Sequence, residues 1–125
     1  MVKYIPEQGD IVFVDFDPTV GHEQKATRPA IVISNNSFNK YTNMAIMCPI
    51  SSNIKDFPTH YVLEDTEKIK GAVLCEHIRS MDYAQRKLKY VEKATQKDLL
   101  SVLTLMNACV DDWKAIDIFW QKRYN

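Results

Sequence analysis

Residues 6–34 have the sequence PEQGDIVFVDFDPTVGHEQKATRPAIVIS, in which two short apolar runs flank a polar segment. The first run, residues 11–16, is rich in β-branched and aromatic side chains, which favour strands. Pro18 ends it, because proline lacks the N–H group that a sheet requires. Residues 30–34 are the second run. The stretch predicts two strands joined by a polar loop over residues 17–28, a length typical of functional loops.

Short apolar runs separated by polar segments continue as far as residue 91, with one helical turn expected around residues 37–40 and a polar loop at residues 51–58. The last run is expected at a sheet edge, because lysines at 87, 89 and 93 disfavour pairing with another sheet. The predicted strands are residues 44–50, 59–63, 72–74, 77–81 (continuing the preceding strand or separate from it) and 88–91.

The pattern changes to helical after Thr95, which can cap a helix with Asp98 as a capping-box partner. Apolar side chains recur at helical spacing from Leu99 to Trp120, and residues 95–125 contain no proline or glycine. One long helix and two helices joined by a kink both fit. Short strands followed by a helix predict a mainly β fold with a C-terminal helix, of the α+β or β-barrel class.

The chain of 125 residues suits one domain, and no linker or repeat is present. Its 16 basic and 16 acidic residues exclude a simple polycation that coats nucleic acid. The charges are nevertheless unevenly distributed, since residues 67–97 contain eight basic and four acidic residues. This segment is either a face that meets a polyanion or a solvated charged surface.

Three widely spaced cysteines, Cys48, Cys75 and Cys109, each lie among apolar residues, as expected for reduced thiols in a core. We find neither a signal peptide nor an apolar run long enough to span a membrane, so we expect a cytoplasmic protein. Cys75 and His77 are the only close pair of metal-ligand types. Without CxxC, HExxH, GxGxxG or P-loop motifs, no metal or nucleotide cofactor is expected.

Three segments carry candidate chemistry. Arg28 is held in extended backbone by Pro29, and its guanidinium either binds a phosphate or staples the loop by pairing with Glu23 or Asp17. Ser51 and Ser52 end a buried strand, either as functional hydroxyls or as turn formers. The third segment, residues 76–82, alternates charged and apolar side chains, which is also typical of a half-buried strand.

The chain resembles the MazF/PemK family of type II toxin–antitoxin toxins, also called mRNA interferases. The resemblance covers about residues 4–110 and rests on four segments: the quoted residues 6–34, PISS at 49–52, GAV at 71–73, and EHIRSMD at 76–82 followed by Arg86. It implies an SH3-like β-barrel domain over residues 1–110, which includes a C-terminal helix, and a homodimer. Residues 111–125 then form a helical extension of the same domain, whose large apolar residues cover the core or form a patch for a partner.

The resemblance also implies metal-independent cleavage of single-stranded RNA, in which the 2′-OH attacks the adjacent phosphate and leaves a 2′,3′-cyclic phosphate and a 5′-OH. The implied partners are single-stranded mRNA and an inhibitory antitoxin with an acidic tail. Rival functions on the same fold are a gyrase-targeting toxin and a non-catalytic interaction module.

The resemblance assigns catalytic roles to four residues of this sequence. Arg28 would stabilise the charge of the phosphorane, and Ser51 would bind a phosphate oxygen. The base would be Glu76 or His22. Ser51 stands where Thr is commoner. Leu74 stands where the PemK branch has a second catalytic Arg, so the role of acid falls on Arg28. The expected RNA-binding residues are Thr19, Glu23, Gln24, Ser52, Arg79 and Arg86.

Overall fold

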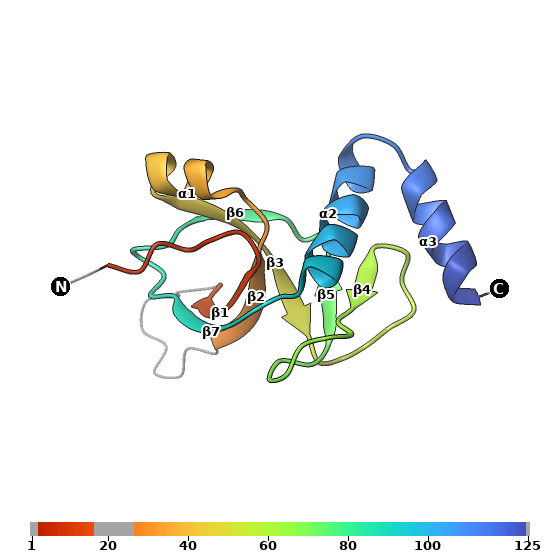
Figure 1. Ribbon diagram of the computed structural model, residues 1–125, viewed down its shortest axis with the longest axis horizontal. Helices are drawn as coiled ribbons and strands as arrows, with labels where there is room; N and C mark the ends of the chain where they lie inside the picture. The colour runs from red at the N-terminus through yellow and green to blue at the C-terminus, as the bar shows by residue number, and fades with distance from the viewer. Residues whose placement is uncertain (1–2, 17–26, 125) are drawn as a thin grey trace.

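The computed structural model of the protein describes residues 3–16 and 27–124. Within these ranges it has seven strands and three helices (Figure 1). In chain order they are β1 (Asp10–Asp15), β2 (Thr27–Val32), α1 (Asn36–Thr42), β3 (Met44–Ser51), β4 (His60–Val62), β5 (Ala72–Leu74), β6 (Arg79–Asp82), β7 (Lys89–Lys93), α2 (Gln96–Val110) and α3 (Lys114–Tyr124).

All strand pairs are antiparallel, and the order along the sheet is β4-β5-β3-β2-β1-β7. The remaining strand, β6, pairs with the first half of β3, whereas β5 pairs with its end. The expected mainly β fold with a C-terminal helix is therefore confirmed. The predicted edge strand is β7, which lies at one end of the sheet.

Both faces of the central strands are buried, which explains their nearly continuous apolar sequences. Ile11, Ile31 and Cys48 belong to the cluster that α2 covers. Their neighbours point to the opposite face, where a second cluster contains Val12 and Ala30. In Figure 1, α2 lies over β4 and β5, while α1 lies at the other end of the molecule.

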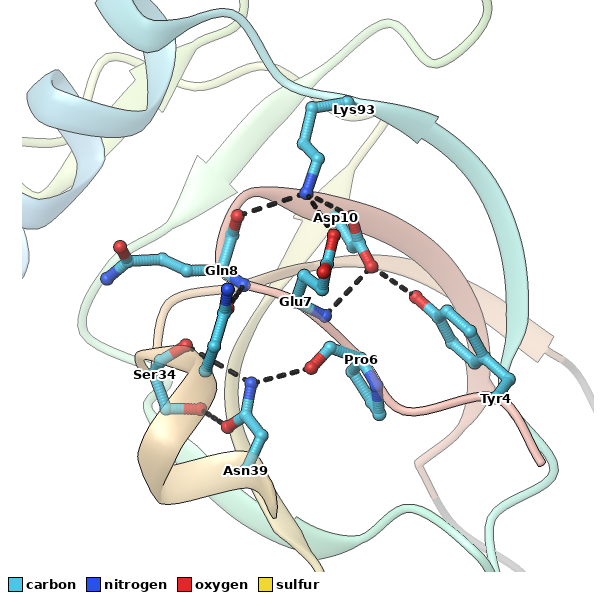
Figure 2. Close-up of polar contacts among 9 residues, drawn as sticks. Tyr4, Pro6, Glu7, Gln8, Asp10, Ser34, Asn39 and Lys93 are labelled. Carbon is cyan, nitrogen blue, oxygen red and sulfur yellow. Dashed lines mark hydrogen bonds and ion pairs between the residues drawn. The ribbon is translucent and has the colours of Figure 1, made fainter. Parts of the chain in front are cut away.

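A buried carboxylate joins the first strand to the last (Figure 2). Asp10 is 2% exposed; it accepts hydrogen bonds from the Tyr4 hydroxyl at 2.5 Å and from the Glu7 backbone N–H at 2.9 Å. Its other oxygen lies 2.7 Å from Nζ of Lys93 on β7. The segment before β1 is thereby fixed to the edge of the sheet.

Helix α2 begins at the predicted cap, where the Thr95 hydroxyl accepts from the Asp98 N–H at 3.2 Å. The Asp98 carboxylate, however, does not complete a capping box. It is fully buried and accepts from the Tyr61 hydroxyl at 2.7 Å and from the backbone N–H of Asp65 at 3.1 Å. This carboxylate therefore holds the loop that follows β4.

Two elements differ from the sequence prediction, and a third region takes one of the two arrangements left open. The expected turn at residues 37–40 is a longer helix, α1, because Asn35 caps it by accepting from the Phe38 N–H at 2.8 Å. The second strand starts at Thr27, so Arg28 lies within β2 rather than in the loop. Of the two arrangements expected after residue 95, the structure has two helices, which Asp111, Asp112 and Trp113 separate.

Helix α3 packs on α2 through Ile116, which is 1% exposed and belongs to the same cluster as the α2 core residues. Trp113 and Ile118 are half exposed. The side chains of Phe119 and Trp120 lie outside the described part of the chain. No helix among the described residues has the length and apolar character needed to cross a membrane.

Candidate active site

Arg28 and Ser51 lie just beyond the paired part of β2 and β3. The two strands are antiparallel, and the last pair at this end joins Ala30 of β2 to Pro49 of β3. If the same register continued for two more residues, Arg28 would lie opposite Ser51. Because alternate side chains share a face, Arg28 and Ser51 lie on the face opposite α2.

Arg28 is solvent-exposed at this edge and pairs along the backbone with Val14 of β1. Its guanidinium remains charged at any physiological pH and presents a planar set of donors. The buried Val14 and Ala30 beside it give the strand a fixed position. A rigid strand therefore presents a permanent cation to solvent, which suits binding to a phosphate.

Ser51 is half-buried, and its hydroxyl makes a local turn. Its Oγ accepts from the Asn53 N–H at 3.1 Å, so the turn-forming role considered for this serine is present. Oγ also donates to the carbonyl oxygen of Asn53 at 3.4 Å, a long hydrogen bond that a phosphate oxygen could replace. Ser52, the next residue, is exposed.

Two further arginines lie around Phe16, at the end of β1. The guanidinium carbon of Arg79 is 5.4 Å from the centre of the Phe16 ring. Arg86 Nη1 donates to the carbonyl oxygens of Asp15 and Phe16, each at 3.2 Å. Arg79 is exposed and free to meet a polyanion, whereas Arg86 is half-buried and fixes the end of β1.

Glu76 lies in the turn after β5, where three side chains surround its carboxylate. Oε1 accepts from the Thr59 hydroxyl at 2.5 Å, and Oε2 lies 2.9 Å from Nε2 of His60 and 3.6 Å from Nε2 of His77. Partial burial raises the pKa of Glu76, but the hydrogen bonds from Thr59 and His60 outweigh it and hold the pKa below its usual value. The group is therefore a carboxylate at neutral pH.

The structure groups Glu76 with His60 and not with Arg28 or Ser51. Ser51 pairs with Ala72, and Glu76 follows four residues later in the chain, in the turn after β5. Among the described contacts, no hydrogen bond or ion pair joins Glu76 to Arg28 or Ser51. His60 nevertheless pairs with Leu74, which follows Ala72 by two residues, so it lies on the same face of the sheet as Ser51.

Sequence reasoning missed Thr59 and His60 as neighbours of Glu76. His60 lies in none of the motifs that the sequence singles out, and sixteen residues separate it from Glu76 in the chain. The signal that would have found it is the pairing of β4 with β5, which places His60 opposite Leu74. The remaining predicted site residues lie outside the described part of the chain: Thr19, His22, Glu23 and Gln24.

Two of the thiols are buried as predicted. Cys48 and Cys75 are free and fully buried, and Cys109 is partly exposed. Burial raises the pKa of Cys48 to about 12, so its thiol is not a nucleophile at neutral pH. Among residues 3–16 and 27–124, no group of three or more His, Cys, Asp or Glu side chains is arranged to hold a metal ion.

The chain is similar to known proteins in both sequence and fold. Residues 7–109 match the family described as PemK-like, MazF-like toxin of type II toxin-antitoxin system. The chain is 37% identical over 84 residues to the endoribonuclease toxin MazF of Escherichia coli K12, covering 67% of this chain and 75% of that protein. It is 36% identical over 110 residues to the endoribonuclease toxin ChpB of the same strain, covering 84% of this chain and 94% of that protein.

Among solved structures, the MazE-MazF complex (Form-II) from Deinococcus radiodurans superposes with a TM-score of 0.78 and 31% sequence identity. The alignment covers 86% of this chain and 97% of the matched chain. The expected fold of the MazF type is thereby confirmed. The family match ends at residue 109, before α3 begins at Lys114.

Proposed function

The chain belongs to the PemK-like, MazF-like toxin family of type II toxin–antitoxin systems, and from this premise we propose that it is an endoribonuclease that cleaves single-stranded RNA. The observation that carries the proposal is the pairing of Ala30 with Pro49, which puts Arg28 and Ser51 at the adjoining ends of β2 and β3 with side chains on the same sheet face. A fixed cation beside a hydroxyl suits a phosphodiester, whose charge increases as the phosphorane forms. The endoribonuclease names of the relatives support the same activity.

The reaction we propose needs no metal ion. The 2′-oxygen attacks the adjacent phosphorus while a base takes the 2′-proton, and the bond from phosphorus to the 5′-oxygen breaks. The leaving oxygen takes up a proton, which gives a 2′,3′-cyclic phosphate and a 5′-OH end. Arg28 stabilises the phosphorane charge and faces the leaving oxygen, and Ser51 donates a hydrogen bond to a phosphate oxygen.

The base in this proposal is His22 or Glu76. Proton transfer requires hydrogen-bond contact between the base and the 2′-OH. The hydrogen bonds from Thr59 and His60 keep Glu76 in the charged form that a base needs, and its side chain is 29% exposed.

A homodimer is the assembly we propose. The sheet face opposite α2 carries partly buried apolar side chains at Pro49, Val62 and Leu74, which belong to neither of the two core clusters of the described residues. The loop after β3 adds the exposed Ile54 and Phe57. An apolar face of this kind is typical of a surface that another chain covers.

The second partner we propose is an antitoxin, as in the MazE-MazF complex from Deinococcus radiodurans. The exposed Arg28 and Arg79 suit an acidic tail that competes with RNA for the same cations. The protein would act in the cytoplasm, where mRNA is present, and its free cysteines fit a reducing compartment.

The test is incubation of the purified protein with a long single-stranded RNA in the presence of EDTA, followed by mapping of the product ends. We expect discrete cuts with 5′-OH and cyclic phosphate ends, lost in Ser51→Ala and retained in Ser51→Thr. Absence of cutting by a folded dimer would refute the proposal. It would favour a gyrase-targeting toxin or a non-catalytic interaction module instead.

A further inference from the structure

His60 is the buried neighbour of Glu76, and the function proposed above leaves it without a role. Its side chain is 11% exposed, and Nε2 lies 2.9 Å from Glu76 Oε2. The preceding residue, Thr59, donates its hydroxyl to Glu76 Oε1 at 2.5 Å. Two consecutive residues at the start of β4 therefore contact both oxygens of one carboxylate.

We propose that His60, together with Thr59, is a positioning residue that fixes the Glu76 carboxylate as a hydrogen-bond acceptor for RNA. The inference rests on the proposed function. A carboxylate has about four acceptor sites. Thr59, His60 and the backbone N–H of Glu76 itself occupy three of them, which leaves one for a ligand. The Glu76 side chain is 29% exposed, which leaves this remaining site accessible.

The local packing makes His60 a rigid support. Its backbone pairs with Leu74, two residues before Glu76, and its ring packs against Phe57 at 4.9 Å between centroids. His77 also faces Oε2, but at 3.6 Å and with a side chain that is 58% exposed. A buried donor at 2.9 Å restricts a carboxylate, whereas an exposed ring beyond hydrogen-bond distance does not.

The titratable groups around Glu76 come from four elements. They are His60 on β4, Cys75 and His77 in the same turn, Cys48 on β3 and Cys109 on α2. Burial raises the pKa of all three thiols, so they remain neutral. Loss of the hydrogen bond from His60 should therefore change the titration of the Glu76 carboxyl group itself.

The experiment measures two quantities in the full-length protein. One is the titration of the Glu76 carboxyl carbon by ¹³C NMR; the other is kcat and KM for RNA cleavage as a function of pH. The variants are His60→Leu, Thr59→Val and His60→Gln, whose side-chain amide can donate in place of the imidazole. His77→Gln is the matched control.

We expect His60→Leu to increase the proton affinity of Glu76 about tenfold, the usual effect of losing a hydrogen bond to a charged group. The acidic limb of the cleavage profile should move to higher pH, with a lower kcat. Thr59→Val should act in the same direction, His60→Gln should restore most of the loss, and His77→Gln should change neither quantity.

Unchanged titration and cleavage in folded His60→Leu and Thr59→Val proteins would overturn the inference. An equal effect of His77→Gln would overturn it too, because a bulk charge effect would then suffice. Wild-type protein that cuts no RNA, yet shows the expected titration shifts, would refute the endoribonuclease proposal and still support the contact between His60 and Glu76.

Discussion

Gly71 packs directly against the backbone of Ser51. A Cβ atom added at Gly71 would lie 3.0 Å from the carbonyl carbon of Ser51 and closer still to its carbonyl oxygen. Gly71 also has a φ of 142°, which side chains other than glycine rarely adopt. The position of Ser51 at the end of β3 therefore depends on the absence of a side chain at residue 71.

Gly71→Ala should lower the free energy of unfolding by about 3 kcal/mol, because strain and a backbone clash act together. Gly9→Ala is the matched control: Gly9 also has a positive φ, but an added Cβ would meet only side chains at 3.4 Å. We expect about 1 kcal/mol for this control. Urea unfolding of the two variants measures both values, and equal losses would contradict the role of the Ser51 contact.

Arg86 should matter for folding more than for RNA affinity. Its Nη1 bonds to two carbonyl oxygens at the end of β1, and hydrogen bonds from a charged group contribute about 1.5–3 kcal/mol. Arg86→Met should therefore lower stability by about 2 kcal/mol, while Lys89→Met, at an exposed position of β7, should change it little. Unchanged stability together with weaker RNA binding would instead favour a direct contact between Arg86 and RNA.

Stability should fall on acidification through Glu92. Burial raises the pKa of Glu92, but the backbone N–H groups of Glu67, Lys68 and Ile69 bind its carboxylate and hold the pKa below the usual value. A carboxyl group with a lowered pKa in the folded state stabilises the fold above its unfolded pKa of about 4.3 and loses that contribution as the pH falls.

Unfolding free energies measured from pH 7 to pH 3 should therefore decrease below about pH 5 in the wild type. The decrease should be smaller in Glu92→Gln, which starts from a lower stability at pH 7. Glu67→Gln, at an exposed position of the same loop, is the control and should keep the wild-type slope. A wild-type slope in Glu92→Gln would show that the pH dependence arises elsewhere.

We propose that residues 111–125 extend the same domain, and Ile116 provides the test. Ile116 is 1% exposed in the α2 cluster, whereas Ile118 on the same helix is 49% exposed. Ile116→Ala should cost about 2–4 kcal/mol, as for other buried aliphatic residues. Ile118→Ala should cost less than about 0.5 kcal/mol. Similar small effects of both changes in thermal unfolding would indicate that α3 is not part of the folded core.

Local chemistry made the strands and the start of α2 predictable. The β-branched runs in β1 and β2 fix strands through side-chain shape, and Thr95 fixes the helix start through its hydroxyl. The break after α2 was left open, because Asp111, Asp112 and Trp113 include neither proline nor glycine. Ile116 packs against α2 after the break. The helical spacing of apolar residues in the sequence does not reveal such a contact.

The sequence identified individual candidate residues of the site, but not the contacts between them. Arg28 and Ser51 were expected to act together, and the register of β2 and β3 supplies the physical reason. The surroundings of Glu76 depend on the pairing of β4 with β5, a long-range contact that no local pattern encodes. The contact of the Arg86 guanidinium with the backbone at the end of β1 is also long-range, and the sequence alone does not reveal it.

The most direct test of the proposed endoribonuclease activity is the single-turnover cleavage rate of Arg28→Ala relative to the wild type, with circular dichroism and melting temperature as checks of folding. Arg28 is exposed at a strand edge, so the variant should fold normally. We predict a rate lower by on the order of a hundredfold or more, the usual effect of losing a donor to transition-state charge. An unchanged rate in the folded variant would contradict the assignment of Arg28 to the reacting phosphate.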